Sequence, residues 1–287
     1  MPYVCVGQEN SGRIDLYYDD LGAGEPVVLV HGFPFSSRSW EKQVPPLLAA
    51  GHRVIAYDRR GFGGSSRPGV GYDYDTFADD LTVLVEELDL SAVSLVGFSM
   101  GTGEIVRYLG THGSARVRSA VLLAPIPPFL LRTDDNPRGI DQAVFDAVSA
   151  AIVADRPAYL EALLDEASNA DVRGRTRISE QARRLSWNVA TEASAVATLA
   201  CVRAWLTDFR DDLPAVDVPT LVVQGTEDRI LPIDVTGRRL PELVADVQVV
   251  EIDGGPHNIC WTHADEVNGA LLEFLAHDPP QEKRYDR

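Results

Sequence analysis

Alternating stretches and continuous apolar runs dominate the first part of the chain. Apolar and polar residues alternate along residues 3–6 and 13–19, which predicts an antiparallel pair of strands at a sheet edge. Strands buried on both faces are predicted for the apolar runs at residues 27–30, 53–57, 92–96 and 118–123. Helical periodicity is found between them, at residues 40–50, 77–88 (with Thr76 as the expected N-cap) and 104–109. Because strands and helices alternate, we expect a mostly parallel sheet with helices on both faces.

This alternation stops at a Pro-Ile-Pro-Pro sequence, residues 125–128. Only helical stretches follow, at residues 140–154, 157–168, 179–189 and 193–206. Strands resume at residues 220–224 and 247–252, and a last helix is expected over residues 264–275. We therefore predict an α/β core formed by residues 1–124 and 211–287, with residues 125–210 inserted as a helical cap. The polar end, residues 278–287, contains two prolines and is expected to be a loose tail.

Composition and charge narrow the classes of function. The 287 residues are 45% hydrophobic and 24% charged, which is ordinary for a globular protein. A formal net charge of -17 disfavours nucleic acid and an anionic membrane surface as partners. The three cysteines are far apart and form no C-x-x-C motif, so neither a disulfide framework nor a zinc site is indicated. The first residues lack the pattern of a signal peptide, and no apolar run approaches the roughly 20 residues that span a bilayer, so we expect a cytoplasmic protein.

A G-x-S-x-G motif centred on Ser99 separates a predicted strand from a predicted helix. Glycines on both sides of the turn remove the Cβ atoms that would clash there, so the Ser99 hydroxyl is expected to stand exposed above the sheet. The amide of Met100 points to the same space from the helix N-terminus. Ser99 is therefore the predicted nucleophile, and the alternative is a turn without chemical consequence.

The same glycines, together with Gly103, also resemble the cofactor turn of short-chain dehydrogenases. That family has this turn near the N-terminus and needs a Tyr with a Lys four residues later. The chain has two lysines, Lys42 and Lys283, and neither follows a Tyr at that spacing. Nucleophilic chemistry is therefore favoured over dinucleotide binding.

A serine hydroxyl needs a base to take its proton, and His257 follows the last predicted strand in a Gly-Gly-Pro-His sequence. Ligands of an open parallel sheet gather at the carboxyl ends of its strands, so His257 can share an edge with Ser99. The alternative is an ordinary loop histidine. His263 begins a helix and is expected at the surface. His31 is expected to have a structural role, because the loop after residues 27–30 must bend away from the strand at this point.

A carboxylate must fix the tautomer of the base and stabilise its charged form. Asp228 follows the strand predicted at residues 220–224, again at a carboxyl end, and is our choice. Glu227 and Asp253 are the alternatives.

Two N–H donors are needed for the oxyanion that develops during acyl transfer. The Met100 N–H is one, and the Phe33 N–H, in the loop after residues 27–30, is the candidate for the other. Pro34 has no N–H and cannot serve. The sequence shows no haem-ligand motif and no metal cluster, so we expect neither a metal nor a cofactor.

The order Ser99, Asp228, His257 is that of the α/β-hydrolase family, and the chain is identified as a member. Six segments resemble the cofactor-free bacterial haloperoxidases: residues 58–63, 71–77, 97–104, 129–137, 207–210 and 261–263. This resemblance implies the α/β-hydrolase fold, an eight-stranded and mostly parallel sheet with an inserted helical cap. It also implies an acyl-enzyme on Ser99 that is attacked by water or by hydrogen peroxide. The product is then an acid, or a peracid that oxidises halide in solution.

The resemblance leaves the substrate open, because relatives also act as aryl esterases and γ-lactamases. We predict a serine hydrolase and perhydrolase for small esters, carboxylic acids or lactams, and a homo-oligomer by family resemblance. A γ-lactamase or amidase on the same residues is one alternative, and a non-catalytic binding module on a hydrolase scaffold is another. A lyase or dioxygenase would need further pocket groups that the sequence does not indicate.

The cap is expected to supply an apolar wall of the substrate pocket. Phe129, Trp187 and Trp205 are the aromatic candidates, and Ile126 and Pro34 complete the predicted pocket. Packing within the cap is the alternative role, and for Trp187 it is the favoured one. The prolines of the Pro-Ile-Pro-Pro sequence would stiffen one wall. A proline at the position of Pro34 resembles the arrangement that favours peracid formation in related esterases.

Overall fold

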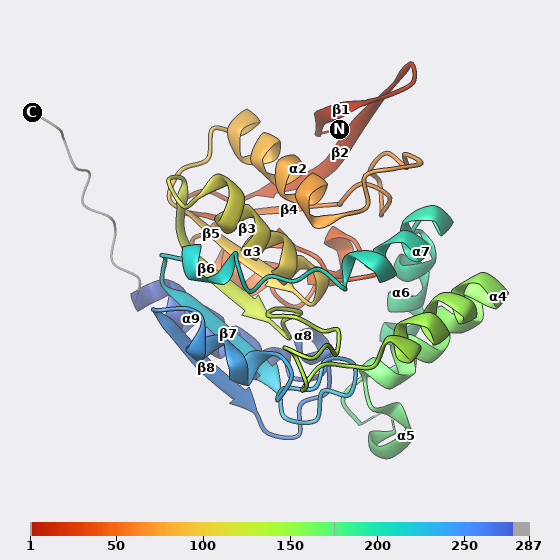
Figure 1. Cartoon of the computed structure of the whole chain (residues 1–287). Coiled ribbons are helices and arrows are strands. Elements are labelled where there is room, and N and C mark those ends of the chain that lie inside the picture. Colours follow the sequence, from red (N-terminus) through yellow and green to blue (C-terminus); the bar gives the residue numbers. More distant parts are fainter. Residues whose placement is uncertain (1, 175, 278–287) are drawn as a thin grey trace, which may run out of the picture.

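One sheet runs through the whole molecule (Figure 1). The computed structural model describes residues 2–174 and 176–277, so the tail expected at residues 278–287 lies outside the described residues. The sheet has eight strands in the order β1-β2-β4-β3-β5-β6-β7-β8. Their bounds are β1 Tyr3–Glu9, β2 Gly12–Leu21, β3 Pro26–Val30, β4 Arg53–Tyr57, β5 Val93–Phe98, β6 Val117–Leu123, β7 Thr220–Gly225 and β8 Val247–Ile252. β2 pairs antiparallel with β1 and β4, and the later pairs are parallel, which confirms the predicted fold class.

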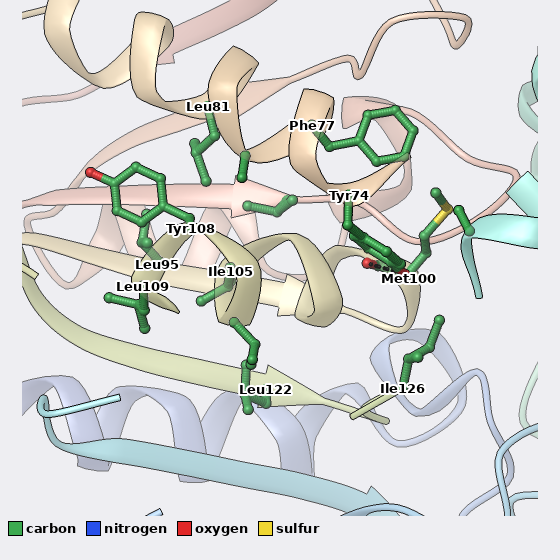
Figure 2. Close-up of a cluster of buried hydrophobic side chains, with 14 of the residues drawn as sticks. Tyr74, Phe77, Leu81, Leu95, Met100, Ile105, Tyr108, Leu109, Leu122 and Ile126 are labelled. Carbon is green, nitrogen blue, oxygen red and sulfur yellow. Dashed lines mark hydrogen bonds between the residues drawn. The ribbon is translucent and has the colours of Figure 1, made fainter. Parts of the chain in front are cut away.

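Helices cover both faces of this sheet (Figure 1). The helical elements are η1 Ser37–Trp40, α1 Val44–Ala49, α2 Tyr74–Glu87, α3 Met100–His112, α4 Gln142–Ala167, α5 Ala170–Arg173, α6 Glu180–Thr191, α7 Ala195–Ala204, η2 Leu213–Ala215, η3 Gly237–Glu242, α8 Ile259–Thr262 and α9 Ala264–His277. Side chains of α2 and α3 pack over β5 and β6 in one apolar cluster (Figure 2). A second cluster joins α1 and α9 to the opposite face. The sheet is therefore fixed on both sides, and its strand ends have defined positions.

Two helices begin earlier than the sequence predicts. Thr76 is not the N-cap of α2; that role falls to Asp73, whose carboxylate accepts a hydrogen bond from the Thr76 N–H at 2.9 Å. An aspartate in this position satisfies an N–H that the first helical turn leaves without a partner. α3 starts at Met100 rather than at residue 104, because glycines in its first turn hide the helical pattern.

The chain between β6 and β7 contains α4 to α7, which lie beyond the carboxyl ends of the parallel strands (Figure 1). α4 contains a break at Asp155, with φ −159° and ψ 89°, two residues before Pro157. The two helices predicted at residues 140–154 and 157–168 correspond to the two halves of α4. The short helix α5 was not predicted.

Candidate active site

Ser99 occupies the sharp turn between β5 and α3, with φ 51° and ψ −115°. Such a positive φ is strained for a residue with a side chain and persists only where the surroundings hold it. The turn is held because the Ser99 N–H donates to Leu123 O at 2.8 Å. A Cβ at Gly101 would lie 2.1 Å from Val30 O, and one at Gly97 would lie 2.8 Å from the carbonyl of Gly101. Both glycines of the motif are therefore required by close backbone contacts.

Three side chains form one hydrogen-bond chain at the carboxyl ends of β5, β7 and β8. The Ser99 Oγ lies 2.9 Å from His257 Nε2, and His257 Nδ1 lies 2.8 Å from Asp228 Oδ2. All three residues are buried. The structure thus brings together the predicted nucleophile, base and acid, while Glu227 and Asp253 are exposed.

The carboxylate of Asp228 is held by its own loop. Its Oδ1 accepts hydrogen bonds from the Ile230 N–H at 3.0 Å and the Leu231 N–H at 2.8 Å. Because an ionised carboxylate only accepts hydrogen bonds, Oδ2 accepts one from the N–H of His257 Nδ1. His257 Nε2 is then the acceptor for the Ser99 hydroxyl, which is the tautomer a general base needs.

Of the residues with the two predicted oxyanion donors, Met100 directly follows Ser99 and Phe33 lines the same cavity as Ser99. Met100 is the first residue of α3, so its N–H has no acceptor within the helix. Within the described residues, neither this N–H nor that of Phe33 donates to a protein backbone acceptor. The Phe33 ring packs edge-on against Trp205, with centroids 4.8 Å apart, and against Phe62 at 6.3 Å. These contacts fix the loop that carries the Phe33 amide.

A buried polar network lies behind this loop. His31 Nδ1 donates to Gly32 O at 2.8 Å, and His31 Nε2 accepts from the Arg59 N–H at 3.0 Å. Burial, together with the charge of Arg59, holds the pKa of His31 well below its usual range. The Arg59 side chain donates to His31 O at 3.0 Å and to Glu104 Oε2 at 2.6 Å. His31 is thus a neutral imidazole that ties the Phe33 loop to α3.

His263 is not at the surface, contrary to the expectation from its place at the start of a helix. It is 1% exposed, and its Nδ1 lies 2.9 Å from Thr262 Oγ1. α9 follows α8 directly at this residue, and the tight connection buries the ring.

A cavity of about 160 Å³ opens onto Ser99 and His257, and we call it the Ser99 cavity. Its wall is mostly apolar, and the described lining residues are Phe33, Ser99, Ile126, Leu130, Ile140, Val144, Phe145, Val148, Tyr159, Glu166, Trp205, Arg229, Ile230, Leu231 and His257. Two of the five predicted pocket residues, Ile126 and Trp205, are among them.

Three predicted pocket residues lie elsewhere. Trp187 is 38% exposed and lines a separate surface hollow between α4 and α6, because its position on α6 faces outward. Phe129 is buried under Arg210, whose guanidinium lies 5.0 Å from the ring centroid. Pro34 is buried beside the Ser99 cavity but does not line it.

None of the cavity wall that α4 supplies was predicted from the sequence. Val144, Phe145 and Val148 lie one turn apart on one side of α4, and Tyr159 follows after the break. Their i, i+1, i+4 spacing is typical of one apolar helical face, but it does not tell a cavity wall from ordinary packing. The charged residues Glu166 and Arg229 also line the Ser99 cavity, and no sequence pattern predicts this position for either of them.

Among the described residues, no group of three or more His, Cys, Asp or Glu side chains could hold a metal ion. No described helix is both long and apolar enough to cross a membrane.

A mostly parallel sheet with a serine on a strand–helix turn, followed by an acid and a histidine on later loops, defines the class of α/β hydrolases. The family profile described as "alpha/beta hydrolase fold" matches residues 25–264, and the chain belongs to this family. The family membership predicted from the sequence is confirmed.

Individual relatives show which kinds of α/β hydrolase the chain resembles. A bromoperoxidase from Bacillus anthracis has a solved structure that superimposes with a TM-score of 0.92 at 44% identity, covering 96% of this chain and 99% of that one. A Synechocystis sp. protein, whose name places it provisionally among the non-heme chloroperoxidases, is 63% identical over 96% of this chain and 100% of its own length. A bifunctional esterase/perhydrolase from Acinetobacter calcoaceticus is 32% identical over 91% of this chain and 96% of its own length. The chain is therefore an enzyme of the hydrolase and perhydrolase type, similar to the non-heme haloperoxidases.

Proposed function

We propose that this enzyme transfers small acyl groups through a covalent ester on Ser99, to water or to hydrogen peroxide. The observation that carries the proposal is the continuous hydrogen-bond chain from Asp228 through His257 to Ser99, which ends in an apolar cavity. A buried serine that donates to a correctly oriented imidazole is an activated nucleophile. The names of the relatives support the same chemistry.

Each step has a group to perform it. Ser99 Oγ attacks the carbonyl carbon of the ester while its proton passes to His257 Nε2, and Asp228 stabilises the imidazolium. The tetrahedral oxyanion accepts hydrogen bonds from the Phe33 and Met100 N–H groups. The C–O bond to the alcohol breaks as His257 returns the proton to the leaving oxygen. Water then attacks the acyl-enzyme, with His257 as the base again, and the acid is released.

Hydrogen peroxide takes the place of water in the second reaction. Its attack releases a peracid, which oxidises bromide or chloride in solution and is itself reduced to the carboxylic acid. A carboxylic acid can also acylate Ser99 with loss of water, so acid and peroxide together give peracid and water. This route needs only the acyl transfer already described, and Pro34, next to Phe33, is the residue we expect to favour peroxide.

The volume of the Ser99 cavity limits the acyl group. A cavity of about 150 Å³ suffices for a benzene molecule, and this one measures about 160 Å³. We therefore propose acetyl, short aliphatic and single-ring aromatic acyl groups as substrates. We also propose that residues 125–210 act as the cap, because α4 of this segment provides much of the apolar wall.

A rapid-mixing experiment with p-nitrophenyl acetate tests the acyl-enzyme. We expect a burst of nitrophenol that matches the enzyme concentration, and an added acetyl group on the peptide that contains Ser99. Ser99→Ala should abolish the burst and lower kcat by about 10⁴- to 10⁶-fold. Near-normal turnover of the variant would reject Ser99 as the nucleophile.

A further inference from the structure

The carboxyl end of α4 contacts both loops that carry the acid and the base. Ala167 O accepts a hydrogen bond from the Asn258 N–H at 2.8 Å, and Asn258 directly follows His257. Two residues after Ala167, the Asn169 Nδ2 donates to Glu227 O at 2.9 Å. Glu227 directly precedes Asp228, so two residues at the end of α4, Ala167 and Asn169, hold the neighbours of both.

Asn169 is unusual in conformation and burial. It lies in the left-handed region, with φ 50° and ψ 43°, and its exposed fraction is 0%. Asparagine is one of the few residues other than glycine that adopt this conformation readily. Its Oδ1 is buried without a hydrogen-bond partner in the described part of the chain. The bond to Glu227 O is therefore the one polar contact that the side-chain amide makes there.

The backbone of Glu227, the residue before Asp228, is therefore held on two sides. The Glu227 N–H donates to Gly255 O at 2.9 Å, which joins it to the loop of His257. The Glu227 carbonyl accepts from Asn169, which joins it to α4. α4 also lines the Ser99 cavity through Phe145 and Tyr159.

We propose that Asn169 is a positioning residue, which couples the cavity wall formed by α4 to the placement of the Asp228 carboxylate against His257. The inference rests on the proposed function of Ser99, His257 and Asp228, and Asn169 touches neither substrate nor reacting atoms. Removing its amide frees the Asp228 loop to shift relative to His257. A misplacement of about 1 Å in a catalytic group costs about 100-fold in rate.

Two variants separate positioning from folding. Asn169→Gly keeps the left-handed backbone and removes the amide, and Asn169→Asp keeps the shape but replaces the donor with an acceptor opposite Glu227 O. Asn10→Gly is the matched control, because Asn10 is also left-handed, with φ 52°, but lies exposed in the turn between β1 and β2. Each protein is mixed with p-nitrophenyl acetate, and the burst counts its folded, reactive sites.

For both Asn169 variants we expect kcat per reactive site to fall about 10- to 100-fold, with KM within about threefold of wild type. Asn10→Gly should match wild type in both constants. Unchanged kcat per reactive site in both variants, even with fewer sites, would overturn the proposal and make Asn169 a folding residue only. Near-normal turnover by Ser99→Ala would instead reject the proposed function itself.

Discussion

Gly225 and Gly255 lie backbone against backbone, where the chain leaves β7 and β8. A Cβ placed on Gly225 would be 2.0 Å from Gly255 O, so no larger residue fits without moving one of the loops. The same contact is reinforced by the hydrogen bond from the Glu227 N–H to Gly255 O at 2.9 Å. Three residues beyond Gly225 is Asp228, and two residues beyond Gly255 is His257. A contact between two residues that have no side chains thus helps to set the separation of acid and base.

Gly225→Ala should therefore lower kcat strongly, although it adds only one methyl group. The added methyl group must push the two loops apart, and we expect kcat to fall about 100-fold. Overpacking at this position should also lower the free energy of unfolding by about 1–3 kcal/mol. Steady-state kinetics and urea unfolding measure the two effects.

Gly269→Ala is the matched control for this change. Gly269 lies on α9 with open space around the position of a Cβ, so alanine should leave kcat unchanged and stabilise the helix by about 1 kcal/mol. Equal kinetics in Gly225→Ala and Gly269→Ala would show that the contact between Gly225 and Gly255 does not control the site.

Asp228→Asn should leave the fold intact while lowering kcat by about 10⁴-fold. The amide oxygen can still accept from the Ile230 and Leu231 N–H groups, but the imidazole of His257 is left with the wrong tautomer. Glu227→Gln alters the exposed neighbour, and we expect its kcat to stay within about twofold of wild type, as for most exposed substitutions. Steady-state kinetics of both variants on p-nitrophenyl acetate decide which of the two carboxylates is the acid. If Glu227→Gln were the more harmful change, the acid would be misassigned.

The sequence predicted which side chains meet at the strand ends better than it predicted the lining of the cavity, and the reason is physical. Ser99, Asp228 and His257 each follow a strand, and strand ends of a parallel sheet converge whatever the details of packing. Trp187 and Trp205 both lie in stretches predicted as helical, and only tertiary packing turns one outward and the other toward Phe33. The role of Asn169 depends on a left-handed turn that no local pattern indicates.

Trp205→Ala should widen the Ser99 cavity and shift its acyl preference. We expect the ratio of kcat/KM for p-nitrophenyl hexanoate to that for the acetate to rise about tenfold, since each methylene in a pocket is worth about 1–3 kcal/mol. Trp187→Ala should leave this ratio unchanged, because its side chain lines a separate hollow. A shift in Trp187→Ala alone would assign the pocket wall to Trp187 in place of Trp205.

The buried pair of Arg60 and Asp80 predicts a pH dependence of stability. Arg60 donates to both carboxylate oxygens of Asp80 at 2.6 Å, yet burial outweighs this pairing and raises the pKa of Asp80 to about 6. In the unfolded chain the pKa of an aspartate is about 3.9. A raised value means that the contribution of Asp80 to stability is complete below about pH 4 and is lost as the pH rises through 6.

Asp80→Asn removes this titration. As the pH rises from 4 to 7, the free energy of unfolding of the variant should therefore increase relative to that of wild type, by up to about 3 kcal/mol. Urea unfolding of both proteins at the two pH values measures the difference, and other carboxylates cancel in the comparison. A change of the opposite sign would mean that Arg60 stabilises the ionised carboxylate more than burial penalises it.

Halogenation by this enzyme should require a carboxylic acid. In the proposed route the oxidant is a peracid, and its acyl group must first form an ester with Ser99, so peroxide and halide alone cannot react through this site. Bromination of monochlorodimedone with peroxide and bromide should therefore proceed in acetate buffer and stop in a buffer without carboxylate.

Ser99→Ala should remove the acetate-dependent rate, by the same factor of about 10⁴ to 10⁶ that triad losses cost in ester hydrolysis. A metal chelator should have no effect, since neither the attack of Ser99 nor the return of the proton by His257 involves a metal. Equal rates in the two buffers, or loss of activity with the chelator, would reject the acyl-enzyme route to halogenation while leaving ester hydrolysis by Ser99 intact.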